Sequence, residues 1–384
     1  MQTDDLSRGP AAEVAGGIKG GGPITFAEFM DIVLYGEGGY YTSGKGSWGA
    51  HGDYITSLDV SPVFARLLAR QVSQIWDALG RPAEFGLMEA GAGRGWLTRG
   101  IVDTIRSENP GLSRALRATL VEKGPGPPQP QDDDGGEGQG LAWCGDISEA
   151  GVHAAGCVLS NELIDSFPVH RVLMEEGGLK ELYVGLEGSS FVDVPGPLST
   201  PELAGYFESA GVTLVHGQKA EVNLEAGRWL RSAAARFTCG FVITIDYGLP
   251  ARELYAPERR EGTLHCHYRH TLNDNPYINI GSQDITTQVD FSALVTSGRA
   301  SGLELTGFAT QKNFLLGLGI CDELSEADGG ALAEAERIAY NRELARLIAP
   351  GGMGDTFKVL IQHKGVERPL LSGFSFKDQS RFLP

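Results

Sequence analysis

The sequence contains few cysteines and no long apolar segment. Its five cysteines are scattered along 384 residues without a CxxC pair, which favours reduced thiols over a disulfide framework. The longest apolar runs, such as residues 241–245, are far shorter than the roughly 18 residues that a membrane span needs. We therefore expect a protein that does not insert into a membrane.

Cations are also scarce. Lysine and arginine total 32 against 49 aspartates and glutamates, so the formal net charge is −17. Nucleic-acid binding needs a clustered cationic face, and this balance argues against it, whereas a cationic partner would suit an acidic surface. The first six residues lack both the apolar stretch of a secretory signal and the arginines of a transit peptide, so we expect a cytoplasmic location.

The sequence also lacks the spacing of histidines and cysteines that is typical of a metal site. There is no HExxH motif, and the histidines in segment 265–270 have no second ligand pair at the spacing of a structural zinc site. We therefore expect polar loop residues there and no metal.

From residue 84 onward, strand patterns alternate with helical ones. Short apolar runs of the kind buried in a parallel sheet occupy 85–89, 118–122, 156–160 and 240–246. Two later strands are expected at 303–309 and 356–362, with a helix at about 330–348 between them. This alternation predicts an α/β fold with a doubly wound sheet, built from residues 83–170, 236–248 and 301–365.

The remaining segments do not show this alternation of strand and helix patterns. Residues 1–22 end in a glycine-rich stretch and are expected to be a flexible arm, while 23–82 read as an N-terminal helical segment on the substrate side. Residues 171–235 and 249–300 are expected to be insertions after the fourth and fifth strands that form a substrate-side subdomain. Residues 124–140 lack large apolar side chains and are expected to be a disordered loop.

A glycine-rich turn follows the first strand of the expected sheet. Its pattern is Glu89-x-Gly91-x-Gly93-x-Gly95, which differs from the GxGxxG of dinucleotide-binding folds. The spacing lets the backbone approach a ligand without a pyrophosphate, and the acid before the turn can hold an amino group. The pattern therefore suits S-adenosylmethionine better than NAD, although a simple tight turn remains the alternative.

Two further acids follow the next strands. Glu122 ends the second strand, where doubly wound folds place a carboxylate on ribose hydroxyls, but it could equally be a solvated turn residue. Asp146 follows a third short strand and could accept a hydrogen bond from an adenine amino group. Capping of a helix N-terminus is the alternative for Asp146.

The fourth and fifth strands also end in polar residues. Asn161, Glu162 and Asp165 follow the fourth strand, and Asp246 ends the fifth. Because the carboxyl ends of parallel strands lie at one edge of a sheet, we expect these side chains to line a ligand crevice, with Asn161 on the cofactor side. Glu162, assisted by Asp165 or Asp246, could clamp a guanidinium. An exposed pair of capping acids is the alternative.

Several ordered motifs carry a family resemblance. They are Thr25-Phe-x-x-Phe-Met30, Gly39-Tyr-Tyr41, Gly52-Asp-Tyr-Ile-Thr56, the turn from Glu89 to Gly95, Asn161-Glu-x-x-Asp165, Asp246-Tyr-Gly248, Asp284-Ile-Thr286, Gln311-x-x-Phe-Leu315 and Met353-Gly-x-x-Phe-Lys358. Together they resemble the MidA-like S-adenosylmethionine-dependent methyltransferases, over about residues 23–365.

The resemblance implies a class I, Rossmann-like methyltransferase core with S-adenosyl-L-methionine as cofactor. It places Glu89 to Gly95 and Glu122 on that cofactor. It also implies a protein-arginine acceptor, dimethylated symmetrically, in a subunit of respiratory complex I (NADH dehydrogenase). Methylation of a small molecule or of another side chain is one alternative, and a non-catalytic assembly factor that keeps the fold is another.

Overall fold

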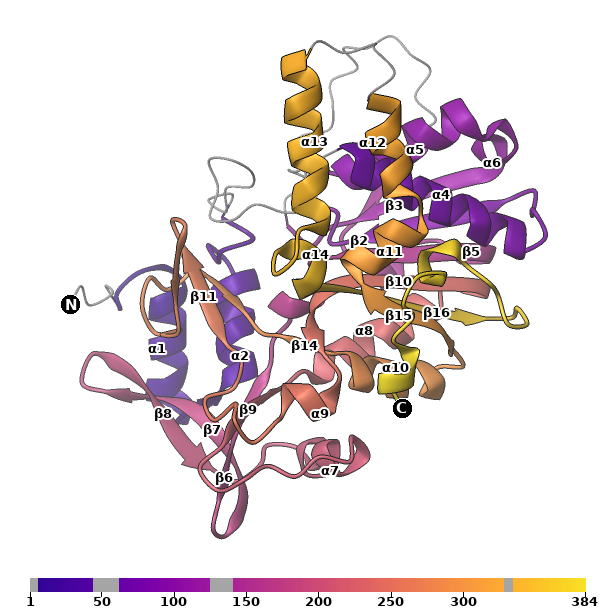
Figure 1. Cartoon of the computed structure of the whole chain (residues 1–384). Coiled ribbons are helices and arrows are strands. Elements are labelled where there is room, and N and C mark those ends of the chain that lie inside the picture. Colours follow the sequence, from indigo (N-terminus) through magenta and orange to yellow (C-terminus); the bar gives the residue numbers. More distant parts are fainter. Residues whose placement is uncertain (1–5, 44–61, 125–140, 328–333) are drawn as a thin grey trace. The chain divides into compact units, whose positions relative to one another are not determined.

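The computed structural model describes residues 6–43, 62–124, 141–327 and 334–384 (Figure 1). The chain forms two compact units, each assembled from three separate stretches of sequence. Unit 1 comprises Met1–Ile55, Ile164–Arg228 and Leu249–Leu294, and unit 2 comprises Thr56–Leu163, Trp229–Gly248 and Val295–Pro384.

Unit 2 is built on a mixed sheet in the order β15-β16-β10-β5-β2-β3-β4. Its parallel strands are β2 (Phe85–Ala90), β3 (Leu116–Val121), β4 (Ala142–Cys144), β5 (His153–Asn161) and β10 (Phe237–Leu249). The antiparallel strands are β15 (Glu304–Thr310) and β16 (Phe357–Lys364). The prediction of a doubly wound α/β sheet is confirmed, and the strand order reverses direction between β2 and β5, where such folds bind ligands.

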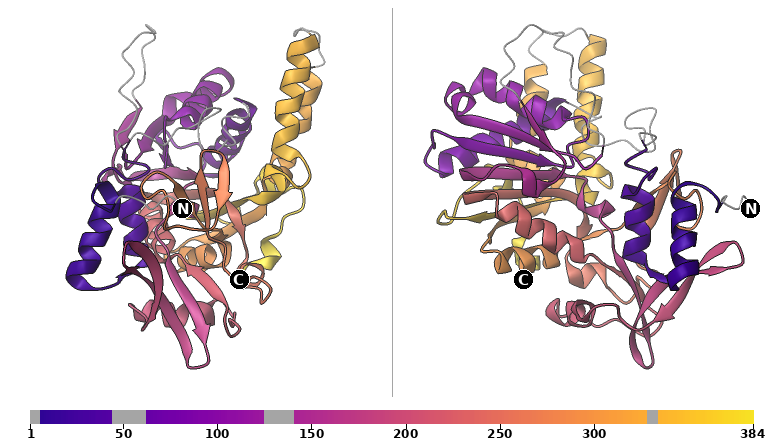
Figure 2. Two further views of the ribbon diagram at one scale, coloured as in Figure 1. Left: turned by 90° about the vertical axis from the view of Figure 1, so that its left-hand side faces the viewer. Right: turned by 180° about the vertical axis from the view of Figure 1, so that it is seen from behind.

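The helices of unit 2 belong to the same core as the sheet. They are α4 (Pro62–Ala78), α5 (Trp96–Glu108), α6 (Pro110–Ala115), α11 (Gln311–Gly317), α12 (Ile320–Ala327), α13 (Glu334–Ile348) and α14 (Met353–Thr356), with single turns η2 (Ile147–Glu149), η4 (Ser372–Phe374) and η5 (Ser380–Phe382). Fully buried Leu67 of α4 and Ile101 of α5 pack with Leu87 and Ile243 of the strands. Figure 2 shows α4 and α5, in purple, along the sheet. This core fixes where the carboxyl ends of the strands lie.

Unit 1 contains smaller sheets and short helices. One sheet has the order β1 (Ile24–Thr25), β7 (Gly178–Glu187), β6 (His170–Glu175) and β9 (Lys219–Val222), with β8 (Ser190–Gly196) also paired to β7. A second sheet has the order β12 (Thr271–Asn273), β11 (His265–Tyr268) and β13 (Asp284–Thr286). Its helical segments are α1 (Gly9–Gly21), α2 (Phe26–Met30), η1 (Asp31–Tyr35), η3 (Ile164–Ser166), α7 (Pro201–Ser209) and α9 (Ala251–Leu254). The remaining elements are α8 (Leu224–Ala234), β14 (Val289–Asp290) and α10 (Phe291–Ala300).

The N-terminal segment differs from its prediction. Residues 1–22 were expected to be a flexible arm, but 9–21 form helix α1, whose Val14 and Ile18 are buried in the core of unit 1. These two apolar residues are four apart and so share one helix face. The prediction was wrong because the many glycines, which disfavour helix, obscured this short apolar stripe.

Other local predictions are confirmed. The segment 23–82, expected to be helical, contains α2, where Thr25 and Glu28 form a capping box. It also contains α4, which begins at Pro62 among the residues with described structure. The predicted disordered loop at 124–140 and the motif at 52–56 fall, apart from Gly124, outside the described ranges. The roles assigned to the N-terminal segment and the two insertions stay predictions.

No helix in the described part of the chain is long and apolar enough to cross a bilayer. The cytoplasmic location stays a prediction.

Candidate functional site

The glycine-rich turn links β2 to α5 and has a left-handed backbone. Gly91, Gly93 and Gly95 have φ angles of 70°, 52° and 72°, a region that side chains disfavour. A Cβ on Gly91 would lie 2.8 Å from Leu163 Cδ1, and one on Gly95 would lie 2.7 Å from Leu120 Cδ1. A Cβ on Gly93 would meet no described atom within 4 Å. Gly91 and Gly95 therefore allow close packing around the turn, while no described residue fills the space next to Gly93.

Glu89 lies beneath this turn at the end of β2 and is only 2% exposed. Its Oε2 accepts hydrogen bonds from the backbone N of Thr98 at 3.0 Å and from Thr98 Oγ1 at 2.6 Å. These bonds tie the first turn of α5 to the sheet. Burial raises the pKa of Glu89 to about 7; the Thr98 hydrogen bonds oppose this rise and the charge of Glu122 adds to it. A nearby cationic amino group would favour the ionised form of this carboxylate.

Glu122 follows β3 and contacts the turn directly. Its Oε2 accepts a 2.8 Å hydrogen bond from the backbone N of Gly93, and its Oε1 accepts one from Gly124 N at 3.2 Å. The half-buried carboxylate therefore lies beside the backbone expected to face the ligand. This is the position from which a carboxylate reaches a ribose in doubly wound folds.

Asp146 caps a helix N-terminus, which was the alternative to an adenine contact. It is the N-cap of η2, where its Oδ1 accepts from Ser148 N at 2.7 Å and from Ser148 Oγ at 2.5 Å. These hydrogen bonds, the side-chain one foremost, lower the pKa of Asp146. The capping function is thus present, and a contact with adenine stays a prediction.

Asn161 and Glu162 form the rim at the end of β5. Asn161 Nδ2 donates to Glu162 Oε1 at 3.2 Å, while the buried Asn161 Oδ1 has no hydrogen-bond partner among the described residues. The backbone N of Glu162 donates to Ile245 O at 3.0 Å, which fixes this residue to β10. Its φ of 53° is unusual for a residue with a side chain, and such strain persists mainly where function requires it.

Asp246 lies at the same edge, on β10. It is fully buried, and its Oδ1 accepts a 2.9 Å hydrogen bond from Tyr247 N. Across the antiparallel pair of β10 and β16, Asp246 lies opposite Lys358, so both side chains project from the same face of the sheet. Lys358 Nζ donates to Asp355 O at 2.7 Å and to Thr356 O at 2.9 Å. Sequence reasoning found the motif containing Lys358 but gave that residue no position in the site.

The structure therefore brings most of the predicted residues to one edge of the unit 2 sheet. Asp165 differs, because it lies on η3 in unit 1, where its backbone O accepts a 2.9 Å hydrogen bond from Thr287 N. Its cooperation with Glu162 stays a prediction. In the described part of the chain, no three histidine, cysteine or acidic side chains gather as metal ligands.

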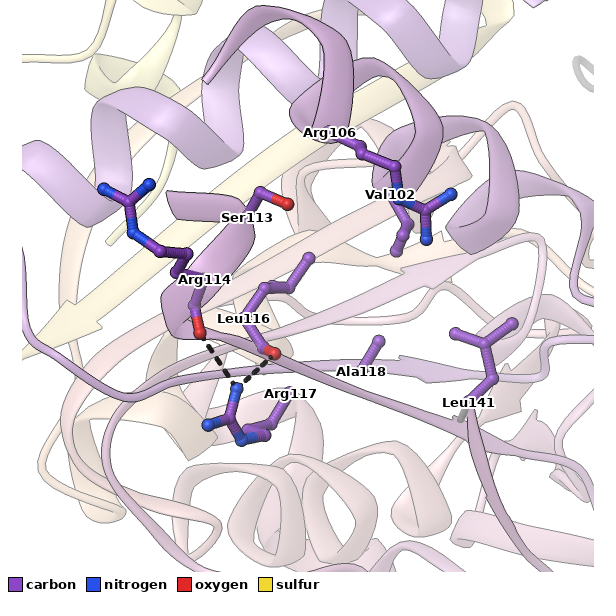
Figure 3. A pocket seen from close by; sticks show the side chains of 8 residues that line it. All are labelled: Val102, Arg106, Ser113, Arg114, Leu116, Arg117, Ala118 and Leu141. Carbon is purple, nitrogen blue, oxygen red and sulfur yellow. Dashed lines mark hydrogen bonds between the residues drawn. The ribbon is translucent and has the colours of Figure 1, made fainter. Parts of the chain in front are cut away.

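A pocket of about 330 Å³ lies at the opposite, amino end of β3 (Figure 3). Its lining includes Arg106, Arg114 and Arg117, but Arg117 Nη1 donates to two backbone oxygens, Arg114 O at 3.2 Å and Leu116 O at 2.8 Å. Figure 3 shows the guanidinium groups of Arg106 and Arg114 pointing in different directions. The three arginines therefore do not converge on a shared ligand position.

Comparisons with known proteins agree with this fold. A family model for S-adenosyl-L-methionine-dependent methyltransferases matches residues 67–309. A Burkholderia thailandensis protein crystallised with S-adenosyl-homocysteine is 30% identical, with a TM-score of 0.81 over 97% of this chain and 96% of that one. The mitochondrial protein arginine methyltransferase NDUFAF7 homolog of Drosophila melanogaster is 28% identical over 90% of this chain and 82% of its own length. Human NDUFAF7, also named a mitochondrial protein arginine methyltransferase, is 27% identical over 91% and 82%.

The residues at the sheet edge fit the cofactor of this family. No described residue fills the space next to Gly93, Glu89 and Glu122 offer acceptors for an amino group and a ribose, and Asn161 Oδ1 is a buried acceptor without a partner in the described chain. The class I core, the glycine-rich turn and the family match lead to one conclusion. This chain belongs to the S-adenosylmethionine-dependent methyltransferase family, and S-adenosyl-L-methionine is its cofactor.

Proposed function

We propose that the protein is a protein-arginine N-methyltransferase. The observation that carries this proposal is the strained Glu162 at the end of β5, beside buried Asp246 on the neighbouring strand, at the edge that holds the glycine turn. Two carboxylates at such an edge favour a cationic acceptor. The names of the curated relatives, which are 27–28% identical to this chain, support the same acceptor.

The chemistry needs positioning more than acid–base catalysis. S-adenosylmethionine supplies an electrophilic methyl group on a sulfonium. In the transfer, the sulfur–methyl bond breaks with its electron pair kept by sulfur, a bond to the guanidinium nitrogen forms, and that nitrogen loses a proton to water. Glu162 would orient the guanidinium by charge-assisted hydrogen bonds and hold the attacking nitrogen in line. Asp246 would add negative charge behind it.

The substrate proposed here is a protein, and specifically a subunit of the respiratory complex I type that is symmetrically dimethylated on arginine. A net charge of −17 would attract a basic substrate segment and accelerate the encounter. The family resemblance described above supports this finer assignment.

Glu162→Gln tests the acceptor role. The substitution keeps the shape of the side chain but removes its charge, and a hydrogen bond between charged groups contributes about 1.5–3 kcal/mol, so transfer to arginine should slow roughly tenfold to a hundredfold. Glu108→Gln, at the exposed C-terminal end of α5, is the matched control and should behave as wild type.

The assay measures methyl transfer to a basic peptide by mass spectrometry at saturating cofactor, with S-adenosylhomocysteine affinity measured in parallel. Wild-type transfer by the Glu162→Gln variant would contradict the clamp. Transfer to a small molecule or to another side chain would favour the first alternative, and cofactor binding without any transfer would favour an assembly factor.

A further inference from the structure

The side chains assigned to the candidate site carry an excess of negative charge. They are the carboxylates of Glu89, Glu122, Asp146, Glu162 and Asp246 and the amide of Asn161. The methionine end of S-adenosylmethionine carries an α-ammonium group and also an α-carboxylate. Carboxylates suit the ammonium but repel the α-carboxylate, and a cation or backbone donors near the turn would offset this repulsion.

Arg94 is the cation within the turn itself, between Gly93 and Gly95. Its side chain is exposed and makes no ion pair within the described part of the chain. The guanidinium carbon instead lies 5.3 Å from the centre of the Trp96 ring. Trp96 is 50% exposed, although tryptophan is highly buried on average in folded proteins. Cation–π stacking thus holds the Arg94 guanidinium against an exposed ring at the start of α5.

The start of α5 adds to the positive potential at this position. The helix runs for 13 residues from Trp96, and its N-cap, Gly95, has no side chain to cap the first backbone amides. Thr98 N already donates to Glu89, but the amides before it point the positive end of the helix dipole toward the turn. Arg94 and this helix start together offer charge and donors to one carboxylate.

Other cations nearby are less suited to this role. Lys358 Nζ donates to two backbone oxygens near α14. Lys123 follows Glu122, the residue assigned to the ribose, and contributes to the lowered pKa of Asp146. Arg99 lies on α5 beyond the first turn. Its substitution therefore serves as a matched control for the substitution of Arg94.

We propose that Arg94 binds the α-carboxylate of the cofactor and that Trp96 is a positioning residue that holds the guanidinium in place. Recognition of the methionine end then divides between Glu89, for the ammonium, and Arg94, for the carboxylate. This assignment concerns cofactor binding and does not depend on an arginine acceptor.

The test measures binding by calorimetry with two ligands, S-adenosylhomocysteine and its decarboxylated analogue. Arg94→Met should weaken S-adenosylhomocysteine binding roughly tenfold to a hundredfold, because it removes a hydrogen-bonded charge pair. The same variant should bind the decarboxylated analogue as wild type does. Arg94→Lys should restore part of the affinity, because it keeps the charge but loses the planar fork of donors.

Arg99→Met makes the same change of charge and should leave both affinities within about twofold of wild type, since salt screens charged groups that do not contact the ligand directly. Trp96→Ala should weaken S-adenosylhomocysteine binding in wild type but not in the Arg94→Met background. Equal loss of affinity for both ligands in Arg94→Met would mean that the substitution disturbs the turn, and unchanged affinity would mean that Arg94 does not touch the carboxylate. Either result would overturn the proposal.

Discussion

Replacement of Glu89 by glutamine should stabilise the ligand-free protein at pH 8 and weaken its binding of the cofactor. Glu89 is buried beneath the glycine turn, and its pKa is raised from 4.5 to about 7 chiefly by burial. The folded protein therefore holds a proton on this carboxyl more tightly than the unfolded chain does. The stability that this group contributes is fully present below about pH 4.5 and is lost as the pH rises through about 7.

The size of this loss of stability follows from the shift in the pKa of Glu89. Each unit of pKa corresponds to about 1.4 kcal/mol, so the contribution of Glu89 to the free energy of unfolding should fall by about 3 kcal/mol across this range. Glutamine has no such titration. At pH 8 the ligand-free Glu89→Gln variant should therefore be more stable than wild type, by less than that amount, because a neutral amide accepts weaker hydrogen bonds from Thr98.

Urea unfolding of both proteins at pH 5 and pH 8 measures this difference. The stability gap between them should move toward the variant as the pH rises. A gap that stays constant, or that favours wild type more strongly at pH 8, would refute the reasoning.

Cofactor binding, unlike stability at pH 8, should favour wild type over the Glu89→Gln variant. An α-ammonium group near Glu89 favours its ionised form, so binding near pH 7 should release protons from wild type, and the enthalpy should depend on the buffer used. Glu89→Gln should bind S-adenosylhomocysteine more weakly and without that proton release. Equal proton release by the two proteins would show that another group is responsible.

Two further substitutions test the turn and the rim. Gly93→Val should abolish measurable S-adenosylhomocysteine binding in calorimetry while the protein stays folded by circular dichroism, because valine resists the φ of 52° and projects into the ligand space; near-wild-type affinity would contradict the role of the turn. Glu162→Gly should raise the free energy of unfolding by about 1 kcal/mol, because glycine adopts the φ of 53° without strain. The same variant should lose methyl transfer. A destabilised variant that still transfers methyl groups would contradict the inference that the backbone strain at Glu162 serves function.

Much of the unit 2 fold was predictable from local patterns. The apolar runs that became β2, β3, β5 and β10 are short and bounded by turn residues, which is typical of buried parallel strands. The placement of Glu89, Glu122, Asn161 and Asp246 at one edge followed from the rule that parallel strands end together. Because these inferences use only local sequence and sheet direction, they did not require knowledge of tertiary contacts.

Other features depend on contacts that sequence does not reveal. The two bonds from Thr98 to Glu89 join residues nine apart through a helix start, and the stacking of Arg94 on Trp96 depends on side-chain rotamers. Lys358 lies opposite Asp246 because β16 runs antiparallel to β10, a direction that the apolar run at 356–362 does not encode. Helix α1 was missed because its stability comes from burial of Val14 and Ile18 and not from helix propensity.

The most direct test of the proposed activity is tandem mass spectrometry of a basic protein substrate, such as a respiratory complex I subunit, after incubation with the full chain and S-adenosylmethionine. The proposal predicts that one or two methyl groups appear on an arginine, that the dimethylated product has one methyl on each terminal nitrogen, and that Glu162→Gln reduces both products. Methyl groups found only on lysine, histidine or a small molecule, or no transfer by a protein that binds the cofactor, would contradict an arginine acceptor.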